Sequence, residues 1–464
     1  MKPILVLQMQ RMGDLILSFP LFLWLQRKYP NQPIWVVAEE RFFRPLMPLS
    51  PRVTYFPWAG TGVLLKQEFS LVLNLSVQPR AAELAGQVRA DRKIGPLVEN
   101  GCRRVRGAWQ LYRQSLVQNN RYNRFHWADL NALDVIPLSV MRATSFDEPR
   151  RLTPEQTKIG LFLGASEPAK RPTPLFWAEL VRALLDRGLR PALLGGPAER
   201  PLGQEVAKAF GGPVLNLCGK LDLGELAAIG QTLQVLVTPD TGPMHLAAWT
   251  GLRVLNLSLG NVNPWETGPY FPGHLVLRPT GSCALGCWAC TRGELRCHRP
   301  YSAKRTAFLI QAMLQGTDDR LQGLTPPGLA LLSSGRGPAG LYSLTRLDAR
   351  TPGAHRLLSR FWTAYFGWRL GLWGEDQARS TWEGLSQNQP KLARALTGRL
   401  PALSRSLGEG LRRGSLEDSF WAEAPLMLRP LTGFLLPLLQ NRDFARQGWI
   451  DAVAWLDALV QISA

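Results

Sequence analysis

The sequence alternates short apolar runs with longer helical patterns, and this alternation occurs twice along the chain. The first series contains "PILVLQM", "PIWVVAE", "RVTYFPW" and "SLVLNLS". The second contains "IGLFLGA", "RPALLGG", "PVLNLCG", "QVLVTPD" and "RVLNLSL". Strands that alternate with helical patterns predict βαβ units around a parallel sheet. The expected fold class is therefore α/β, with two Rossmann-like, doubly wound domains that face a cleft at their strand ends.

A polar stretch that contains two prolines, "MRATSFDEPRRLTPEQTK", separates the two series and predicts a linker. We therefore expect one domain over residues 1-150 and a second over residues 151-316. Beyond these the chain is first rich in Gly, Pro and Ser, and then shows helical patterns with Trp and Leu faces, such as "SRFWTAYFGWRLGLW". Residues 317-464 are expected to form a helical C-terminal extension.

Length and composition exclude a disordered chain and argue against a membrane-spanning one. The chain has 464 residues, of which 45% are hydrophobic. No apolar stretch reaches the roughly 18 residues that cross a bilayer, and the first residues lack the pattern of a cleavable signal, so we expect a cytoplasmic protein. The net charge of +19 creates a positive field that attracts polyanions, and phosphorylated lipid surfaces and nucleic acid both fit.

The first candidate site lies in "LVLQMQRMGDLILSFPLFLWLQ", where Gly13 and Asp14 join an apolar strand to an apolar helix. One interpretation is structural: Asp14 would be the N-cap of the helix and accept backbone N–H groups. The other is functional: the strand ends at the cleft, Gly13 allows close approach of a ligand, and the carboxylate takes a proton from a hydroxyl.

The second candidate site is "QVLVTPDTGPMHLAAWTG", where a strand runs into Asp240, Thr241 and Gly242. Pro243 suits the first position of a helix, and His245 falls on its first turn. Gly242 frees the backbone, Thr241 offers a hydroxyl, and the helix N-terminus presents N–H groups and partial positive charge, which predicts a diphosphate site. The structural alternative is a capped core helix with a satisfied buried histidine.

Two shorter segments at strand ends add polar side chains. "LFLGASEPAKRP" places Ser166 and Lys170 after a strand, where Lys170 could reach a phosphate as a point charge. "LLGGPAER" places Glu199 after a Gly-Gly-Pro turn, where a carboxylate could hold ribose hydroxyls. Each is a weak signal alone, because a Lys or Glu after a turn is usually only solvated.

In this order, five segments resemble glycosyltransferase family 9, which includes the ADP-heptose:lipopolysaccharide heptosyltransferases. They are "QRMGDLILSFPLFLWLQRKYP", "GASEPAKRPTPLFWAEL", "LLGGPAERP", "CGKLDLGELAAI" and "TPDTGPMHLAAWTGLRVLNL". The resemblance covers roughly residues 3 to 280. Two departures are the Arg and extra Pro in "KRPTPLFW" and the helical region beyond residue 316, which has no counterpart in compact members of the family.

The resemblance implies a GT-B fold, with the acceptor mostly on the first domain and the nucleotide sugar mostly on the second. It implies that Asp14 is the general base of an inverting transfer. It also implies that Gly13, Ser166, Lys170, Glu199, Asp240, Thr241, Gly242 and His245 line the nucleotide-sugar site. The leaving diphosphate would be stabilised by Lys170 and a helix N-terminus, with no metal or other cofactor required for catalysis.

The implied reaction is transfer of heptose from ADP-heptose to the inner core of lipopolysaccharide. Its partners would be the nucleotide sugar and an anionic lipopolysaccharide precursor, and the positive charge suits peripheral contact with the cytoplasmic face of the inner membrane. One alternative keeps the family but has a protein or another glycan as the acceptor. Another is a nucleic-acid-binding protein, which the charge would suit, although no recognisable nucleic-acid module is present.

A cluster of cysteines follows the second series of strands. "CALGCWACTRGELRC" contains Cys283, Cys287, Cys290 and Cys297, with His298 as an adjacent spare ligand. Four thiolates so close in sequence can converge on zinc, and Fe–S ligation, disulfide pairing and free thiols are the alternatives. We expect one structural zinc ion that clamps this loop and takes no part in catalysis.

Overall fold

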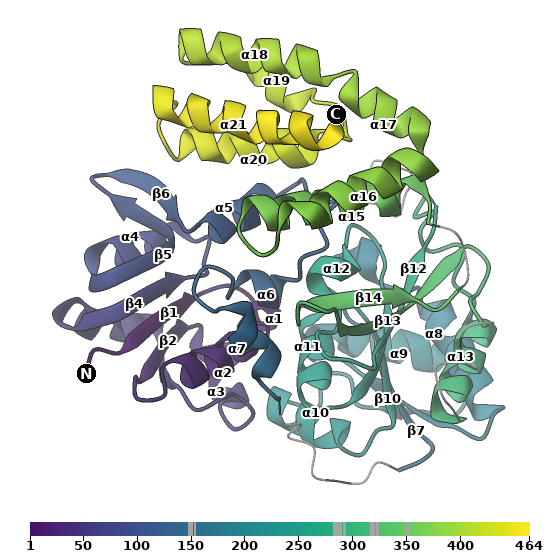
Figure 1. The fold of residues 1–464 in the computed structure, drawn as a ribbon. Coiled ribbons are helices and arrows are strands. Elements are labelled where there is room, and N and C mark those ends of the chain that lie inside the picture. Colours follow the sequence, from purple (N-terminus) through teal and green to yellow (C-terminus); the bar gives the residue numbers. More distant parts are fainter. Residues whose placement is uncertain are drawn as a thin grey trace.

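The chain folds into three regions, seen in Figure 1 as two α/β domains side by side with a layer of helices above them. The first domain contains strands β1 to β6, and the second contains β7 to β14. This computed structural model describes residues 1–146, 152, 155–281, 290, 294–315, 321, 324–348 and 352–464.

The first domain is built on a six-stranded sheet in the order β3-β2-β1-β4-β5-β6. Neighbouring strands are parallel, except for the antiparallel pair β5 and β6. Its strands are β1 (Ile4–Gln8), β2 (Ile34–Ala38), β3 (Thr54–Phe56), β4 (Glu68–Asn74), β5 (Arg89–Glu99) and β6 (Cys102–Arg106). Its helices are α1 (Met12–Ile16), α2 (Phe19–Lys28), α3 (Glu40–Leu46), η1 (Trp58–Lys66), α4 (Pro79–Gln87), α5 (Ala108–Ser115), α6 (Trp127–Leu130) and α7 (Leu138–Ala143).

The helix that the sequence predicts after Asp14 is divided in two. It begins at Met12 as α1 and stops before Ser18, where α2 starts. Pro20 lies in the first turn of α2, where it cannot donate to the carbonyl of Ile16, so the two helices cannot form a continuous hydrogen-bond ladder. Asp14 is therefore the third residue of α1 and not its N-cap.

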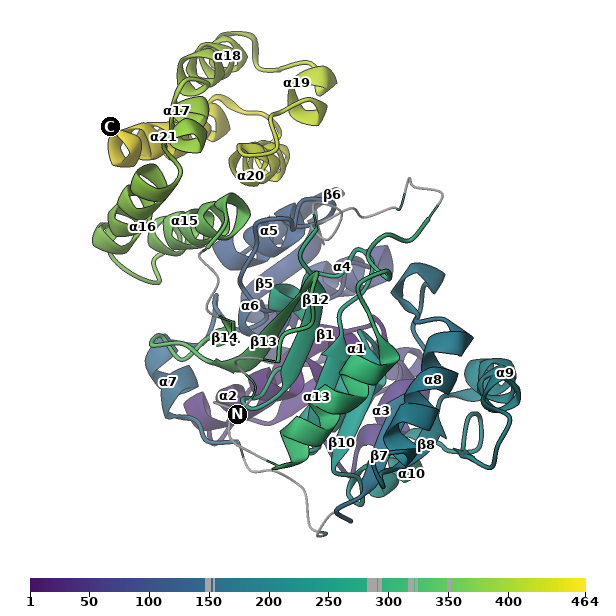
Figure 2. The same cartoon turned by 90° about the vertical axis from the view of Figure 1, so that its right-hand side faces the viewer.

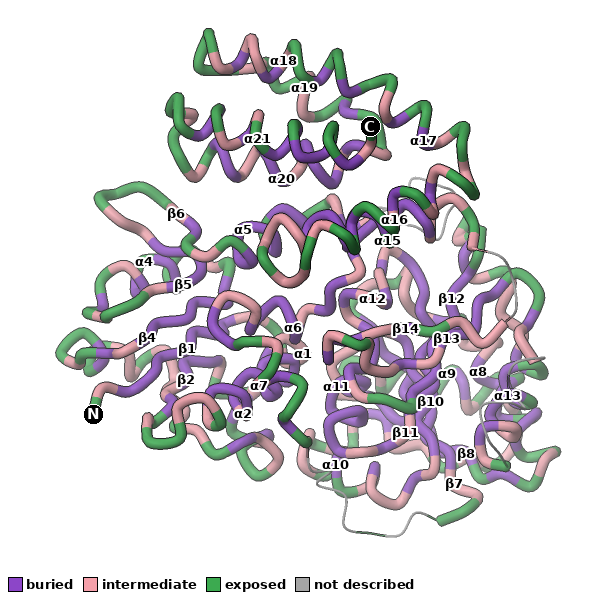
Figure 3. The backbone as a smooth tube through the Cα atoms, viewed as in Figure 1, coloured by how far each residue is buried: buried purple, intermediate pink, exposed green. Residues whose placement is uncertain are grey.

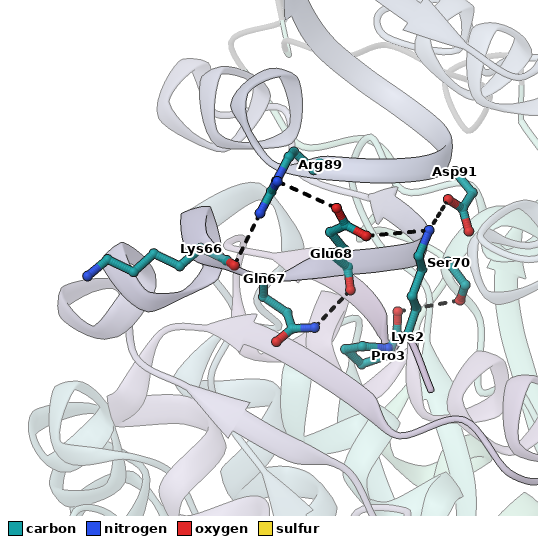
Figure 4. Close-up of polar contacts among 8 residues, drawn as sticks. All are labelled: Lys2, Pro3, Lys66, Gln67, Glu68, Ser70, Arg89 and Asp91. Carbon is teal, nitrogen blue, oxygen red and sulfur yellow. Dashed lines mark hydrogen bonds and ion pairs between the residues drawn. The ribbon is translucent and has the colours of Figure 1, made fainter.

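Ion pairs connect the amino ends of β1, β4 and β5, at the end of the first sheet that lies away from the second domain (Figure 4). The Nζ atom of Lys2 lies 2.5 Å from Asp91 and 3.7 Å from Glu68. Glu68 also pairs with Arg89, at 3.5 Å. All four side chains are exposed or half-exposed, so this edge carries a solvated ion-pair network.

The second domain is built on an eight-stranded sheet in the order β14-β13-β12-β11-β10-β7-β8-β9. Six strands are parallel, and β13 and β14 are added antiparallel at one edge. Its strands are β7 (Lys158–Phe162), β8 (Arg190–Leu194), β9 (Leu215–Asn216), β10 (Val235–Pro239), β11 (Arg253–Leu257), β12 (Leu275–Pro279), β13 (Leu329–Arg336) and β14 (Tyr342–Arg346). Its helices are η2 (Pro168–Lys170), α8 (Pro174–Leu185), η3 (Pro197–Glu199), α9 (Arg200–Phe210), α10 (Leu223–Gly230), α11 (Gly242–Trp249), α12 (Pro264–Thr267) and α13 (Ala303–Gln315).

The hairpin of β13 and β14 belongs to the second domain, so this domain ends later in the chain than the sequence predicts. The sequence analysis places the end of the second domain at residue 316, but β13 pairs with β12 and continues the same sheet. Because β12 would otherwise leave an unpaired edge, the hairpin satisfies its backbone groups. The helical region therefore begins at Ala354, not at residue 317.

The helical extension contains α15 (Ala354–Arg369), α16 (Glu375–Asn388), α17 (Pro390–Thr397), α18 (Leu400–Arg413), α19 (Asp418–Ala422), α20 (Arg429–Gln440) and α21 (Arg446–Ser463). It packs on the first domain, as Figure 2 shows for α15 and α20 beside α5. The rings of Tyr112 and Phe366 lie 4.7 Å apart, and Asn441 exchanges hydrogen bonds of 2.7 and 3.0 Å with the backbone of Val105.

One hydrophobic core joins the three regions, with Trp24, Tyr342 and Phe366 as members from each of them. The buried segments in Figure 3 accordingly run from the sheets into the faces of α15, α20 and α21. None of the described helices is both long and apolar enough to cross a membrane.

Candidate active site

The carboxyl ends of β1 and β10 face each other across the junction of the two domains. A cavity of about 460 Å³ lies between them, which we call the central cavity. Its walls are formed by Arg11, Met12, Gly13, Asp14, Leu17, Phe42, Asn120, Ser166, Glu167, Lys170, Asp240, Thr241, Gly242, Pro243, His245, Asn261, Val262, Asn263, Glu266 and Thr267.

Asp14 enters this cavity from the first turn of α1. Its Oδ2 accepts the backbone N–H of Arg11 at 3.2 Å. The backbone carbonyl of Asp14 accepts the Ser18 hydroxyl at 2.9 Å and the Gln8 side-chain amide at 3.3 Å, so the turn is anchored to β1 and α2. Burial raises the pKa of the Asp14 carboxyl, and the nearby charge of Arg113 opposes this rise.

Arg113 is a buried cation beneath the cavity wall. Only 4% of its surface is exposed, and its Nη1 donates to the carbonyl of Leu75 at 3.0 Å. The guanidinium lies over the ring of Trp127, with 4.4 Å between its carbon and the ring centroid. Burial lowers the pKa of Arg113 to about 10, so it stays charged at neutral pH, and its charge favours the ionised form of Asp14.

Gly13 and Gly242 let the two domains touch. A Cβ atom on Gly13 would lie 3.1 Å from the ring of His245, and one on Gly242 would lie 2.3 Å from the terminal methyl of Met12. The Gly242 Cα is itself 3.5 Å from that Gly13 Cβ position. The sequence analysis predicts ligand approach at both glycines, and in this structure each faces the opposite domain.

The N-terminus of α11 opens into the central cavity. Thr241 is its N-cap residue, and the Thr241 side chain makes no capping hydrogen bond. Pro243 has no N–H and the Met244 N–H donates to the Thr241 carbonyl at 3.0 Å, so the Gly242 N–H is the donor that this turn leaves to a ligand. His245 lies one turn further. Its Nδ1 is buried without a hydrogen-bond partner among the described residues, and burial lowers its pKa to about 4, so the imidazole is neutral at pH 7.

Asp240 precedes this helix and is held in place by α12. Its Oδ2 accepts the Thr267 hydroxyl at 2.6 Å. Burial raises the pKa of Asp240, while the hydrogen bond and the charges of Lys170 and Arg278 lower it. Lys170 is therefore close enough to influence the Asp240 carboxylate, as the sequence pattern predicts for one site.

The loop of Lys170 forms the wall opposite Asp14. Lys170 Nζ pairs with Glu167 at 3.0 Å, and its side chain is 16% exposed. Ser166 also lines the cavity and is exposed. Arg171, one of the two insertions relative to the family pattern, donates to the Ala165 carbonyl at 2.6 Å and so closes the loop on itself.

Glu199 is the predicted site residue that does not line the central cavity. Its Oε2 accepts the Gly196 N–H at 2.9 Å, and its side chain occupies the space that Cβ atoms on Gly164 and Gly195 would need. It lies beside a second cavity of about 480 Å³, which we call the side cavity. The side cavity shares Pro243 with the central one and is lined by Arg41, Pro45, Phe162, Gly195, Gly196, Pro197, Gly219, Lys220, Leu221, Asp222, Leu223, Leu226 and Pro243.

Glu266 is a site residue that the sequence analysis missed. It lies on α12 with 8% of its surface exposed, and it faces the loop of Asn120 and Asn123 from the first domain. Burial raises the pKa of Glu266 to about 7, although hydrogen bonds from both asparagines oppose the rise. The central cavity therefore holds, besides Asp14, a carboxyl whose pKa lies near neutrality.

One signal could have found Glu266. The segment "GNVNPWET" follows β11, which lies next to β10, so the carboxyl ends of these parallel strands share one edge. Arg113 gives no comparable signal, because its place beneath Asp14 depends on how α5 packs against the sheet.

Two of the four cysteines predicted to bind zinc fall within the described residues. Cys283 and Cys287 are outside the described residues; Cys290 is exposed and Cys297 is buried. Among the residues that the structure describes, no group of three or more His, Cys, Asp or Glu side chains could hold a metal ion. His298, the predicted spare ligand, instead makes a 2.8 Å hydrogen bond between its Nε2 and the Ala169 carbonyl in the Lys170 loop. The structural zinc ion stays a prediction.

Comparisons with known proteins agree with this architecture. The profile of glycosyltransferase family 9 (heptosyltransferase) matches residues 63–285. Lipopolysaccharide core heptosyltransferase OpsX of Haemophilus influenzae is 23% identical over 291 residues, which cover 58% of this chain and 82% of that protein. Lipooligosaccharide heptosyltransferase 2 of the same species is 30% identical over 138 residues, which cover 29% of this chain and 40% of the relative. The chain thus spans less than half the length of that relative.

Two solved structures share the fold. A family 9 glycosyltransferase from Veillonella parvula has a TM-score of 0.53 at 22% identity, covering 68% of this chain and 97% of the other. The ADP-heptose lipopolysaccharide heptosyltransferase II of Escherichia coli has a TM-score of 0.50 at 21% identity, covering 67% and 98%. The predicted GT-B architecture is confirmed. The chain is thus similar to glycosyltransferase family 9 over a stretch that covers parts of both domains, and it shares the fold of the two solved proteins over nearly their whole length.

Proposed function

We propose that this protein transfers heptose from ADP-heptose to the inner core of lipopolysaccharide, with inversion at the anomeric carbon. One observation carries the proposal: a half-buried carboxylate, Asp14, and the open N-terminus of α11 face the same cavity from opposite domains. Such a site can accept a proton on one side and hold a diphosphate on the other. We infer that the transferred sugar is heptose because the relatives are named heptosyltransferases.

The diphosphate of the donor would lie at the start of α11. The Gly242 N–H and the helix dipole favour an anion there, and Thr241 adds a hydroxyl. Lys170 supplies a cation that now pairs with Glu167 and would turn to the diphosphate. The unpartnered Nδ1 of His245 offers one more polar contact to a bound ligand.

The nucleoside would occupy the side cavity. The side cavity adjoins the start of α11 at Pro243, so a base bound there can remain linked to a diphosphate in the central cavity. Phe162 and Leu226 give apolar contacts, and the glycines at 195 and 196 let a ligand approach the backbone. Glu199 would reach the ribose by giving up its hydrogen bond with Gly196.

The reaction forms one bond and breaks one. The acceptor hydroxyl gives its proton to an Oδ atom of Asp14, and its oxygen bonds to the anomeric carbon. The bond from that carbon to the diphosphate oxygen breaks, and ADP leaves with the electron pair. The Gly242 N–H, the dipole of α11 and the Lys170 ammonium stabilise the charge that develops on the leaving diphosphate.

The net charge of +19 also supports an anionic acceptor presented at a membrane. Basic surfaces are attracted to anionic lipid headgroups, and such attraction weakens with salt. We infer peripheral contact with the cytoplasmic face of the inner membrane.

Ligand-induced thermal stabilisation is the first test. The protein would be heated with ADP, UDP, GDP or a short DNA duplex, because a ligand of the native state raises the unfolding temperature. We expect ADP to stabilise most. The second test supplies ADP-heptose and purified heptose-deficient lipopolysaccharide and measures ADP release and product mass. Stabilisation by the duplex alone, or absence of transfer to this acceptor despite ADP binding, would contradict the proposal.

A further inference from the structure

A third cavity, of about 240 Å³, lies where both domains meet the helical extension. Loop residues of the first domain, the ends of β12 and β14 from the second, and the first turns of α15 all contribute to its wall. We call it the arginine cavity and define it by Arg121, Arg124, Arg278, Arg346, Arg356 and Ser359. Nothing in the proposed transfer reaction uses these residues.

The charge of this cavity is one-sided. Five arginines line it, and none of its described lining residues is Asp or Glu. Arg346 pairs with Asp348, but in the part of the chain that the structure describes the guanidinium groups of Arg124 and Arg356 make no hydrogen bond or ion pair. Arg124 instead lies over the ring of Trp265, 3.9 Å from its centroid.

Burial and like charge act against these cations. Burial, together with the charges of Arg360 and Arg356, lowers the pKa of Arg124 to about 9. Burial and the charges of Arg360 and Arg346 lower the pKa of Arg356 as well. A bound anion would relieve both effects, because an opposite charge favours the ionised form of each arginine.

Two polar features in the same wall can accept or position an anion. The 16-residue helix α15 starts here, and its N-cap Gly353 has no side chain to satisfy the first N–H groups. Ser359, in the second turn of this helix, is 3% exposed, and its hydroxyl has no hydrogen-bond partner among the described residues. A buried hydroxyl is costly to leave unpaired, so its place beside the arginines points to a ligand.

The arginine cavity adjoins the central cavity. Val262 and Asn263 line both of them. Asn263 fixes this shared wall, because its Nδ2 donates to the carbonyls of Asn120 and Asn123 at 2.8 and 2.9 Å. A molecule whose hydroxyl reaches Asp14 can therefore place a neighbouring substituent among the arginines.

We propose that the arginine cavity binds a phosphate ester group of the acceptor. Calling the ligand an acceptor rests on the proposed function; the affinity for phosphate does not. Arginine binds phosphate through paired N–H groups, and a phosphate monoester carries about −1.5 to −2 charges at pH 7, which suits several cations better than a single carboxylate does. The volume of about 240 Å³ lies below the roughly 300–1,000 Å³ of pockets that enclose whole small molecules, so one headgroup fits.

Calorimetric titration tests the site. Glucose 6-phosphate and, as its uncharged counterpart, glucose would be titrated into the full chain with and without saturating ADP. Phosphatidylcholine vesicles with and without diphosphoryl lipid A form a second arm, which distinguishes a lipid-linked phosphate from a soluble one. The variants are Arg356→Ala and Arg124→Gln, and Arg412→Ala on the exposed end of α18 is the matched control.

We expect glucose 6-phosphate or the lipid A vesicles to bind and glucose not to bind. Arg356→Ala and Arg124→Gln should weaken phosphate binding by roughly tenfold or more. Arg412→Ala should bind phosphate as the wild type does, and all three variants should keep the wild-type affinity for ADP. Wild-type protein that binds neither phosphate probe, or variants that bind as wild type does, would overturn the site. A chain that binds phosphate through Arg356 but fails to bind ADP would refute the proposed function and leave the anion site standing.

Discussion

The turn from β1 into α1 and the turn from β10 into α11 are the same local structure used in two ways. Each follows a central parallel strand, each contains an Asp and a Gly, and the two meet where Gly13 lies against Gly242. In α1 the carboxylate folds back over the start of the helix and accepts the Arg11 N–H, so we call this the closed side, and the charge of Arg113 lies nearby. In α11 the N-cap Thr241 leaves the helix end open.

In the proposed reaction the two turns have opposite roles. The acidic residue inside the first turn of α1 accepts a proton, whereas the acidic residue before α11 leaves the start of that helix to an anion. Asp240 is instead occupied by the Thr267 hydroxyl. The comparison can be tested by altering one side at a time.

The largest expected effect comes from the closed side. Asp14→Asn should reduce turnover by roughly 10²- to 10⁴-fold, the usual contribution of a general base, and leave ADP affinity nearly unchanged. Because burial raises the Asp14 pKa, kcat/KM of the wild type should fall as the pH drops through a value above the usual carboxyl range. Steady-state kinetics across pH would measure both effects. Asp186→Asn, on an exposed residue, is the control, and near-normal turnover of Asp14→Asn would remove it from the mechanism.

The second effect concerns Glu266, between the two turns. Its pKa rises from 4.5 to about 7 on folding, so the native state binds more protons in this range and stability falls as the pH rises through it. Glu266→Gln should match wild type below pH 4.5 and be more stable above pH 7, by up to about 3 kcal/mol. Urea denaturation at several pH values would measure this difference. Exposed Glu179→Gln is the control, and a difference that does not vary with pH would contradict the assignment.

The third effect belongs to the open side. Lys170→Ala and Thr241→Ala should each weaken ADP binding, because each removes a favourable contact to the diphosphate. A charged hydrogen bond contributes about 1.5 to 3 kcal/mol, which corresponds to roughly 10- to 100-fold in Kd. Calorimetric titration would measure the change against exposed Lys208→Ala. Unchanged affinity in both variants would place the nucleotide elsewhere.

The smallest effect is expected at the amino ends of the strands, opposite the cleft. Asp91→Asn removes the partner nearest to Lys2 in the network of Figure 4. Both groups are exposed to solvent, where ion pairs contribute little. The unfolding temperature should stay unchanged within error, and turnover should not respond. A clear loss of activity would mean that this ion-pair network influences the cleft at the other end of the strands.

The sequence predicts the sheets and the two turns because local patterns determine them. Buried strands such as β1 and β10 read as continuous apolar runs, and "DTGPMH" marks the start of α11 by composition alone. The sequence pattern of the β13–β14 hairpin is that of a Gly- and Ser-rich linker. The hairpin is not predicted from it, because its strands form by pairing with the free edge of β12. Arg113 reaches the site only through packing between segments far apart in sequence, whereas Glu266 follows β11, the neighbour of β10.

The chain crosses between the domains twice, from α7 to β7 and back from β14 to α15, which is fastened to α5 and its neighbours. Two connections restrict the relative movement of the domains more than a single connection would, because any movement must be compatible with both. The helical extension thus provides a second connection between the two domains.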